Sequence, residues 1–272
     1  MAESVKVAIA GINGKMGRAS VPAIIADPEL ELVGAFGRAD ASYVGADIAE
    51  MIGSDRKPLG ISVSKNLEDC LSASKPDVLL EFTVAGSALE HARLALKKGV
   101  RPLIGTSGLV ASDFDKLEAW ADEAGLGVMV VPNFSVGAVL MIEFAKQAGK
   151  HFNHVEVIEM HGTKKVDAPS GTAMYTTRKL AENEKSYNLK EVEDHELLKG
   201  SRGGSSQNGV RVHSLRLPGL ISHQDVIFGA DGELLSIRHD SFNTNCFLKG
   251  ILMSIKATRW LKGLTIGLES LL

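Results

Sequence analysis

The chain has 272 residues, of which 44% are apolar and 23% are charged, a composition that is ordinary for a well-packed globular protein and excludes disordered and fibrous classes. Its formal net charge of -3 argues against nucleic acid or an anionic membrane as a partner, so any anion recognition must be local. Cys70 and Cys246 are too few and too far apart for a disulfide framework, and no metal-site spacing, signal peptide or membrane span is evident, so we expect a cytoplasmic protein without a metal.

Short apolar runs alternate with segments of helical periodicity from Val5 to about Val131. The strand-like runs are VKVAIAG, LELVGAF, DVLLEFT, RPLIGT and LGVMVV, and the helical segments are KMGRASVPAIIAD, SALEHARLALKKG and SDFDKLEAWADEAG. The runs are too continuously apolar to have one face in water, which favours a parallel sheet covered on both sides. We therefore predict an α/β domain with a doubly wound parallel sheet.

The pattern changes after the segment VPNFSVGA. A predicted helix over 139–150 leads to the strand-like run VEVIEMH and to a second helix over about 170–183. After a charged, glycine-rich stretch over 190–209, whose RGGSSQNG segment predicts a flexible loop, three strand-like runs follow: VRVHSLRL, DVIFGA and ELLSIRH. Clustered strands favour an α+β domain on an open antiparallel or mixed sheet, and we expect a last helix over 245–261 to return to the first domain.

A glycine-rich turn follows the first predicted strand and precedes a helix. Its spacing is GxxGxxG, a variant of the dinucleotide-binding GxGxxG motif, in which glycines allow a tight turn, close approach of a pyrophosphate and close helix packing. The phosphates would lie at the helix N-terminus, where free N–H groups favour negative charge. The candidate cofactor-binding residues here are Gly11, Ile12, Asn13, Gly14, Lys15, Met16 and Gly17.

The end of the second predicted strand bears on the choice of cofactor. Sites for NAD usually carry an acid here that binds the ribose hydroxyls, whereas this chain has Gly37 and Arg38. An arginine can pair with the 2'-phosphate of NADP, and Lys15 and Arg18 could add positive charge. We therefore expect NADPH to be preferred over NADH. The alternatives are that Arg38 is a surface residue or that Asp40 acts as a displaced acid.

Three further loops follow strands at the expected carboxyl edge of the parallel sheet, where doubly wound folds bind ligands. Small and polar residues there can approach a nicotinamide, although ordinary turn chemistry would also place them there. The last loop could also be a hinge between domains. These candidate cofactor-binding residues are Phe82, Thr83, Gly105, Thr106, Ser107, Pro132, Asn133, Phe134 and Ser135.

The segment HGTKKVDAPSGT, residues 161–172, combines possible proton donors with a helix start. Ser170 is a credible N-cap, and the N–H groups after it, with the Thr172 hydroxyl, suit a substrate carboxylate. His161 and Lys165 could supply protons or positive charge to a reacting centre. A structural histidine and solvated lysines at Lys164 and Lys165 are the alternatives.

These motifs resemble those of the dihydrodipicolinate reductase family, which reduces the dehydrated form of 4-hydroxy-tetrahydrodipicolinate in lysine and diaminopimelate synthesis. Matching segments run in order along nearly the whole chain, from VAIAGINGKMGR through EFT, GTSG and PNFSVG to EMHGTKKVDAPSGTA, HSLRLPG and IRHDSFN. The segment KVDAPSGTA is the most specific of them.

The resemblance implies a Rossmann-type dinucleotide-binding domain over 1–134 and 242–272, and a substrate-binding and oligomerisation domain over 135–241 that closes over the site. It implies NADPH or NADH as cofactor, a small dicarboxylate substrate, a homotetramer, and no nucleic acid or membrane partner. His161 matches the family's catalytic histidine and Lys165 its proton-donating lysine, while Gly171 and Thr172 match its substrate-carboxylate site.

The chain departs from the family pattern at two positions. Gly162 stands where a second histidine is usual, and Thr244 lies near the place of an arginine in the segment matching SFNTNC. We hypothesise that Lys164 compensates by binding the substrate. The departures also keep two alternatives open: a related NADP-dependent imine or amino-acid dehydrogenase, and a non-catalytic NADP-binding sensor.

Overall fold

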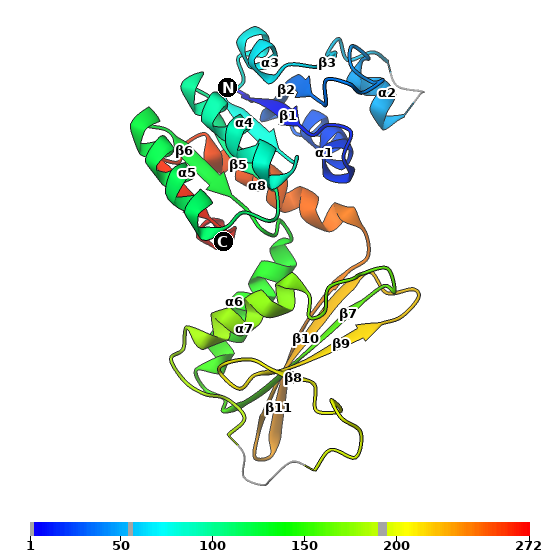
Figure 1. The fold of residues 1–272 in the computed structure, drawn as a ribbon, viewed down its shortest axis with the longest axis vertical. Helices are drawn as coiled ribbons and strands as arrows, with labels where there is room; N and C mark the ends of the chain where they lie inside the picture. Colours follow the sequence, from blue (N-terminus) through cyan, green and yellow to red (C-terminus); the bar gives the residue numbers. More distant parts are fainter. Residues whose placement is uncertain (1–2, 54–56, 190–194) are drawn as a thin grey trace. The chain divides into compact units, whose positions relative to one another are not determined.

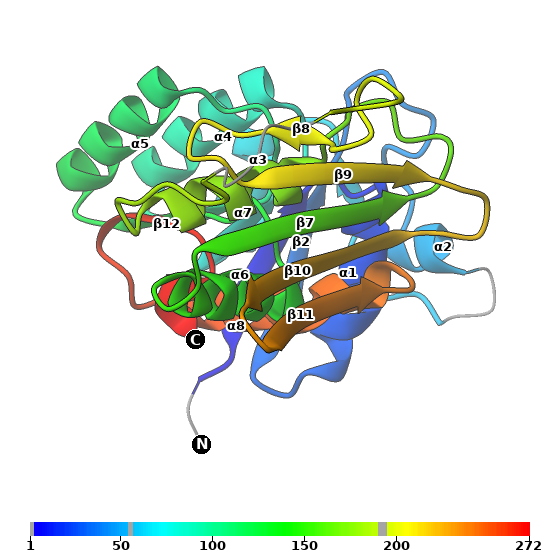
Figure 2. The same cartoon turned by 90° about the horizontal axis from the view of Figure 1, so that it is seen from below.

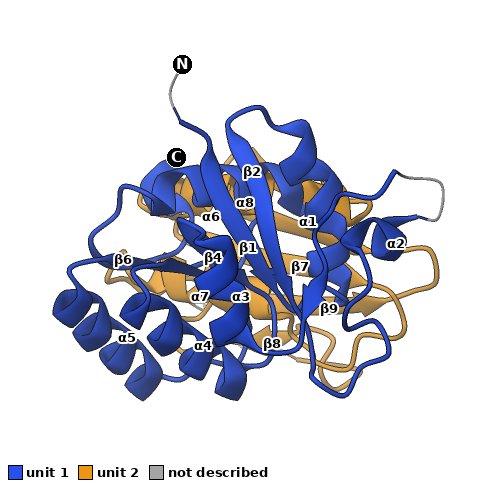
Figure 3. Cartoon of the chain, turned by 90° about the horizontal axis from the view of Figure 1, so that it is seen from above, with its two compact units in different colours: residues 1–135, 247–272 blue, residues 136–246 orange. Residues whose placement is uncertain are grey.

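The computed structural model describes residues 3–53, 57–189 and 195–272. The chain forms two compact units, Met1–Ser135 with Phe247–Leu272 and Val136–Cys246 (Figure 3). Residues 190–194, part of the predicted flexible stretch, lie outside the described residues. None of the helices described has both the length and the apolar character needed to span a bilayer.

Unit 1 contains a seven-stranded sheet in which every neighbouring pair is parallel, as predicted for this part of the chain. The strand order is β12-β6-β5-β4-β1-β2-β3. The strands are β1 (Val5–Ala10), β2 (Leu30–Phe36), β3 (Val63–Ser64), β4 (Val78–Glu81), β5 (Arg101–Ile104), β6 (Gly127–Val130) and β12 (Gly263–Ile266). Strands β4 and β6 are buried along their whole length, because helices cover both faces of the sheet.

Helices lie on both sides of this sheet, which confirms the doubly wound fold (Figure 2). They are α1 (Lys15–Ala26), α2 (Ile48–Ile52), α3 (Leu67–Ser74), α4 (Ala85–Lys97), α5 (Ala111–Ala124) and α8 (Leu248–Thr258), with short 3-10 turns at Thr244–Phe247 and Glu269–Leu271. Apolar side chains of α3, α4 and α5 pack on β1, β4, β5 and β6. Helix α8 packs beside α1 on the same sheet, so the C-terminal segment returns to the first unit as predicted.

Unit 2 is built on a five-stranded mixed sheet of order β11-β10-β7-β9-β8 (Figure 1). Its strands are β7 (His154–His161), β8 (Gly204–Ser205), β9 (Arg211–Arg216), β10 (Ser222–Ala230) and β11 (Glu233–Ser241). Strands β7 and β9 pair in parallel, and the other neighbouring strands pair antiparallel. Helices α6 (Val136–Gly149) and α7 (Gly171–Ala181) bury their apolar side chains against β7, β9 and β10, which confirms the predicted α+β unit.

Several short elements of unit 1 were not predicted. Strand β12 forms the edge of the parallel sheet beside β6, and β3 forms the opposite edge beside β2. Both are too short to produce a clear periodic pattern. The helix predicted over 245–261 begins as a 3-10 turn at Thr244 and becomes α-helical only at Leu248.

Candidate active site

The glycine turn between β1 and α1 has the geometry that close packing requires. Gly11 adopts a φ of +83°, and a Cβ there would lie 2.8 Å from the carbonyl oxygen of Phe82. A Cβ on Gly17 would lie 2.4 Å from the carbonyl oxygen of Gly11. Gly14 is the N-cap of α1 and makes no side-chain cap, so first-turn N–H groups are available to an anion.

A cavity of about 440 Å³ lies beside this turn at the carboxyl ends of β1, β2 and β4. Six of the predicted cofactor-binding residues line it: Gly11, Asn13, Gly14, Arg38, Phe82 and Thr83. The hydroxyl oxygen of Thr83 is buried and has no hydrogen-bond partner among the described residues. The glycines of the turn allow a pyrophosphate to approach closely, the start of α1 offers N–H groups to it, and the unpaired hydroxyl can bind another part of the ligand. The cavity therefore fits a dinucleotide.

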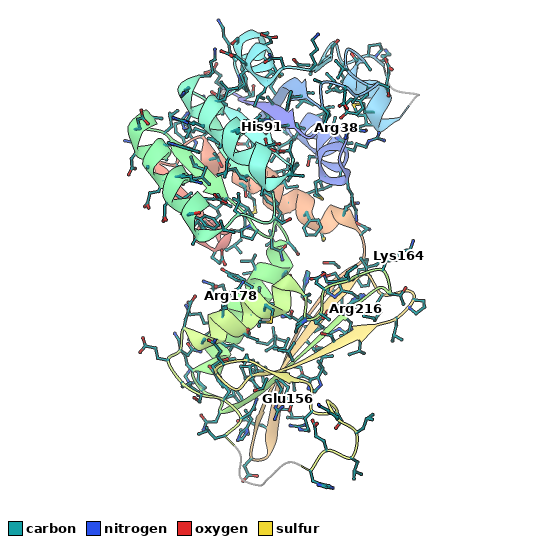
Figure 4. The ribbon with its side chains drawn as sticks, viewed as in Figure 1. Arg38, His91, Glu156, Lys164, Arg178 and Arg216 are labelled. Atoms are coloured by element: carbon teal, nitrogen blue, oxygen red, sulfur yellow. The ribbon has the colours of Figure 1, made fainter. Side chains whose placement is uncertain are left out.

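The basic side chains predicted to bind the cofactor differ in their exposure and in their polar partners. The Arg38 side chain is 81% exposed at the cavity, and its Nε lies 3.8 Å from the Asp40 carboxylate (Figure 4). Arg18 instead donates from Nε to the side-chain oxygen of Asn13 at 2.9 Å. Lys15 is exposed at the start of α1, while Ile12 is buried and could contact a ligand only through its backbone.

The remaining predicted loops meet at the same edge of the sheet. A Cβ on Gly105 would lie 2.4 Å from the Phe82 ring and 2.6 Å from the Phe134 ring, and these two rings stack edge to face. The Thr106 hydroxyl donates to the Thr83 carbonyl oxygen at 3.2 Å. Asn133 accepts the N–H of Ser135 at 2.9 Å. None of the predicted residues of these two loops, 105–107 and 132–135, lines the cavity, and in the glycine turn Ile12, Lys15, Met16 and Gly17 are also outside its lining.

Five residues line the cavity that the sequence did not single out: Phe36, Tyr43, Val84, Ser87 and His91. His91 lies on α4, and its Nδ1 is 2.8 Å from the Glu81 carboxylate, which is wholly buried at the end of β4. The His91 ring also packs edge to face against Phe36. A histidine ten residues after a buried acid was the available signal, but only the fold brings the two together.

In unit 2, a buried carboxylate connects the predicted catalytic histidine to two other elements. Glu159 is two residues before His161 on β7, and its side chain has no exposed surface. It accepts two hydrogen bonds from Arg216 at 3.0 and 2.8 Å, and it lies 2.5 Å from Nδ1 of His161. Its other oxygen accepts the N–H of Ser170 at 3.3 Å, so one carboxylate joins β7, β9 and the start of α7.

Burial and the neighbouring charges act together on the pKa of the Glu159 carboxyl and on that of the His161 imidazole. Burial alone would raise the pKa of Glu159, but hydrogen bonds from Arg216 and Ser214 outweigh it and hold the pKa below its usual value. Burial lowers the pKa of His161, and the positive charges of Lys165 and Arg216 add to this against the raising effect of the Glu159 carboxylate. We therefore assign a neutral His161 that donates from Nδ1 and keeps Nε2 as an acceptor.

Lys165 is paired with a residue that the sequence did not single out. Its Nζ donates to both carboxylate oxygens of Asp167 at 2.9 Å, and this hydrogen bond lowers the pKa of the Asp167 carboxyl. The backbone oxygen of Asp167 also accepts a hydrogen bond from Arg216 at 2.7 Å. Lys164 is exposed, at the same end of the β7–β9 pair as Arg216 (Figure 4).

The start of α7 has the geometry of a carboxylate site. Ser170 is the N-cap, and its hydroxyl accepts the N–H of Ala173 at 3.2 Å, as predicted. Gly171 is exposed, and a Cβ on it would meet nothing within 4 Å, so the helix start has room for a ligand at this position. The N–H groups of Gly171 and Thr172 have no acceptor within the helix. The half-buried Thr172 adds a hydroxyl at the same helix start.

The two departures from the family pattern differ in their surroundings. A Cβ on Gly162 would lie 3.0 Å from the carbonyl oxygen of Leu220, which is tighter than nearly all such contacts. A side chain at 162 would therefore require the loop at Leu220 to shift. Thr244 is half-buried at the beginning of the 3-10 turn after β11.

The described residues contain no group of three or more His, Cys, Asp or Glu side chains placed to hold a metal ion.

Comparison with known proteins gives one consistent result. Two family models match in succession, "Dihydrodipicolinate reductase, N-terminus" over residues 5–134 and "Dihydrodipicolinate reductase, C-terminus" over residues 137–272.

Full-length relatives carry the corresponding enzyme name. A 4-hydroxy-tetrahydrodipicolinate reductase of Synechococcus elongatus is 41% identical over 276 residues and covers all of both chains. One of Bacillus velezensis is 39% identical and covers 99% of this chain and 98% of the relative. The dipicolinate-bound dihydrodipicolinate reductase from Paenisporosarcina sp. TG-14 superposes with a TM-score of 0.88 at 39% identity, covering 99% of this chain and all of that one.

Proposed function

The chain belongs to the dihydrodipicolinate reductase family, and from this premise we propose how its residues divide the work of a 4-hydroxy-tetrahydrodipicolinate reductase. It is an NAD(P)H-dependent oxidoreductase that reduces the dehydrated form of 4-hydroxy-tetrahydrodipicolinate to tetrahydrodipicolinate in lysine and diaminopimelate biosynthesis. NADPH or NADH supplies the hydride. The comparisons give no support to a different dehydrogenase or to a non-catalytic sensor.

We assign dinucleotide binding to unit 1 and substrate binding to unit 2, close to the predicted domains 1–134 with 242–272 and 135–241. The Gly11–Gly17 turn and the free N–H groups of α1 would receive the pyrophosphate. The cavity-lining Thr83 hydroxyl and the loop at Gly105 would meet the remaining parts of the cofactor. These roles rest on the cavity, the orphan hydroxyl and the close approach that the glycines permit.

NADPH is the cofactor that the cavity favours. Arg38 offers an exposed guanidinium at the end of β2, where planar bidentate pairing with a phosphate is available. Gly37, immediately before it, supplies no carboxylate for ribose hydroxyls. A 2'-phosphate would therefore gain an ion pair with Arg38, in competition with the Asp40 carboxylate 3.8 Å from the arginine, and would face no acid at position 37.

The observation that carries the catalytic proposal is the Glu159-centred cluster at the start of α7. Addition of hydride leaves negative charge on a conjugated imine system, which a nearby cation with a transferable proton stabilises. Lys165 can supply that proton, because its Nζ has a third N–H beyond the two held by Asp167. The neutral His161 presents Nε2 as an acceptor and orients the reacting groups rather than donating a proton itself.

The substrate's carboxylates are assigned to the start of α7 and to Lys164. Gly171 and Thr172 would bind a carboxylate through their N–H groups and the Thr172 hydroxyl, close to His161 and Lys165 in the chain, and the buried Ser170 would position them as the N-cap whose own N–H is held by Glu159. Since Gly162 and Thr244 lack the side chains usual in the family, the exposed Lys164 is the candidate for the missing contact.

A homotetramer is the assembly that the resemblance implies, and a cytoplasmic location is the expectation from the few, distant cysteines. The sheet of unit 2 supports it, because α6 and α7 pack on one face of the sheet (Figure 2). The alternation of side chains along the strands places Ile158, Leu215, Ile227 and Leu234 on the other face. Half-exposed apolar side chains on an open sheet are typical of an interface. Light scattering on the purified chain would test the tetramer.

The proposed function is tested by measuring NADPH oxidation with substrate generated in situ by the preceding synthase from pyruvate and aspartate semialdehyde. We expect oxidation that depends on both synthase and this chain. Oxidation at the same rate without this chain would contradict the proposal.

A further inference from the structure

The ring of Tyr43 lies against Gly37, the residue that follows β2, and leaves no room for a Cβ there. A Cβ on Gly37 would lie 2.4 Å from Cε2 of Tyr43, 3.1 Å from its hydroxyl oxygen and 3.2 Å from Cζ. Contacts below 3.0 Å are essentially never seen for a real Cβ. The Tyr43 ring therefore occupies the place of a Cβ at position 37, and a side chain there would require this half-buried ring to move.

The backbone on both sides of this contact is fixed. The N–H of Gly37 donates to the carbonyl of Ser64 on β3, at 3.1 Å. Two residues after Tyr43, the N–H of Gly45 donates to the carbonyl of Val63 at 2.9 Å. Because β3 holds both segments, relief of the overlap would have to come from rotation of the tyrosine side chain itself.

Gly37, Arg38 and Tyr43 all line the same cavity. Position 37 is where a site for NAD would carry an acid to bind the ribose hydroxyls. We propose that Tyr43 is a specificity-determining residue, whose ring excludes an acidic side chain from position 37 and so keeps the cavity suited to a 2'-phosphorylated dinucleotide. This inference rests on the proposed NAD(P)H-dependent function.

The test is direct binding of NADPH and NADH to the full chain by titration calorimetry, which requires no turnover. The variants are Gly37→Asp, Tyr43→Ala, the double variant that combines them, and Arg38→Ala. We expect Gly37→Asp alone to weaken NADPH binding without improving NADH binding. In the double variant the carboxylate has room, and NADH should bind about tenfold more tightly than to Gly37→Asp alone, as expected for one charge-assisted hydrogen bond.

A matched control is Gly86→Asp, which adds a carboxylate between cavity-lining Val84 and Ser87 where a Cβ meets nothing within 4 Å. Tyr43→Ala should give no gain in NADH affinity in that background. The thermal unfolding temperature provides a second readout, since Tyr43→Ala should raise it in the Gly37→Asp chain by removing the overlap.

Two results separate this inference from the function on which it rests. Equal NADH affinity and equal unfolding temperature in Gly37→Asp with and without Tyr43→Ala would overturn the role of Tyr43 alone. Failure of the unaltered chain to bind either dinucleotide would overturn the proposed function and this inference with it. Loss of the preference for NADPH in Arg38→Ala, together with tighter NADH binding in the Gly37→Asp, Tyr43→Ala double variant, would support both the proposed function and the role of Tyr43.

Discussion

Replacing Glu159 is the perturbation whose effect the structure defines most closely. Glu159→Ala would leave the Arg216 guanidinium, 19% exposed, without its carboxylate and the N–H of Ser170 without its acceptor. Breaking such a buried pair costs about 3–5 kcal/mol of unfolding free energy. Glu159→Gln keeps the shape and one acceptor oxygen but loses the charge, and should cost about 1.5–3 kcal/mol.

The same substitution should move the titration of His161. The Glu159 carboxylate raises the pKa of His161 against the lowering effect of burial, so its neutralisation should lower that pKa further. In Glu159→Gln, the acid-side limb of the kcat profile should therefore shift to lower pH. Because the pKa of Glu159 itself is lowered on folding, its stabilising charge is present above the ordinary value of 4.5 and is lost as pH falls through the lowered value.

The assay is kcat against pH for the unaltered chain, Glu159→Gln and a control, Glu156→Gln. Glu156 lies on the same strand and pairs with Arg202 and His213, both at 2.7 Å, but it points to the other face of the sheet (Figure 4). The control should leave the profile unchanged. A lower kcat in Glu159→Gln with no shift of the acid limb would refute the reasoning, since a merely structural carboxylate would give that result.

Three further outcomes follow from the same site. Lys164→Ala should raise KM for the dicarboxylate substrate several-fold with little change in kcat, and an unchanged KM would reject the compensation by Lys164. Ser170→Ala removes the α7 N-cap and should lower the unfolding free energy by about 1 kcal/mol in a denaturant titration. Gly162→Ala should lower the thermal unfolding temperature, because its Cβ meets the Leu220 carbonyl at 3.0 Å, and an unchanged temperature would show that this loop yields without cost.

Local signals in the sequence predicted much of the fold and the helix start at residues 169–172 of the segment HGTKKVDAPSGT. The short apolar runs and the segments of helical periodicity identified the main strands and helices, and Ser170 caps α7 as its sequence context indicates. The glycine turn likewise has the strand–turn–helix setting that its spacing predicts. Such features depend on residues within a few positions of one another, so a single sequence is sufficient to reveal them.

The features that the sequence did not reveal depend on distant pairs. Arg216 is 57 residues from Glu159, and only the β7–β9 pairing joins them. A signal was present, because Glu159 follows Val155 and Val157 on the buried face of β7, where a carboxylate needs a partner. The overlap of Tyr43 with Gly37 had no such signal, since it depends on how β3 holds the intervening loop.

The central claim is that Lys165, beside a neutral His161, completes the reduction while unit 1 binds the cofactor independently. The most direct measurement compares kcat and the NADPH dissociation constant in Lys165→Ala and in the unaltered chain, using substrate generated in situ. We predict a fall in kcat of at least about a hundredfold, the usual worth of a positioned proton donor, with the NADPH dissociation constant nearly unchanged. Full activity in Lys165→Ala would contradict the account.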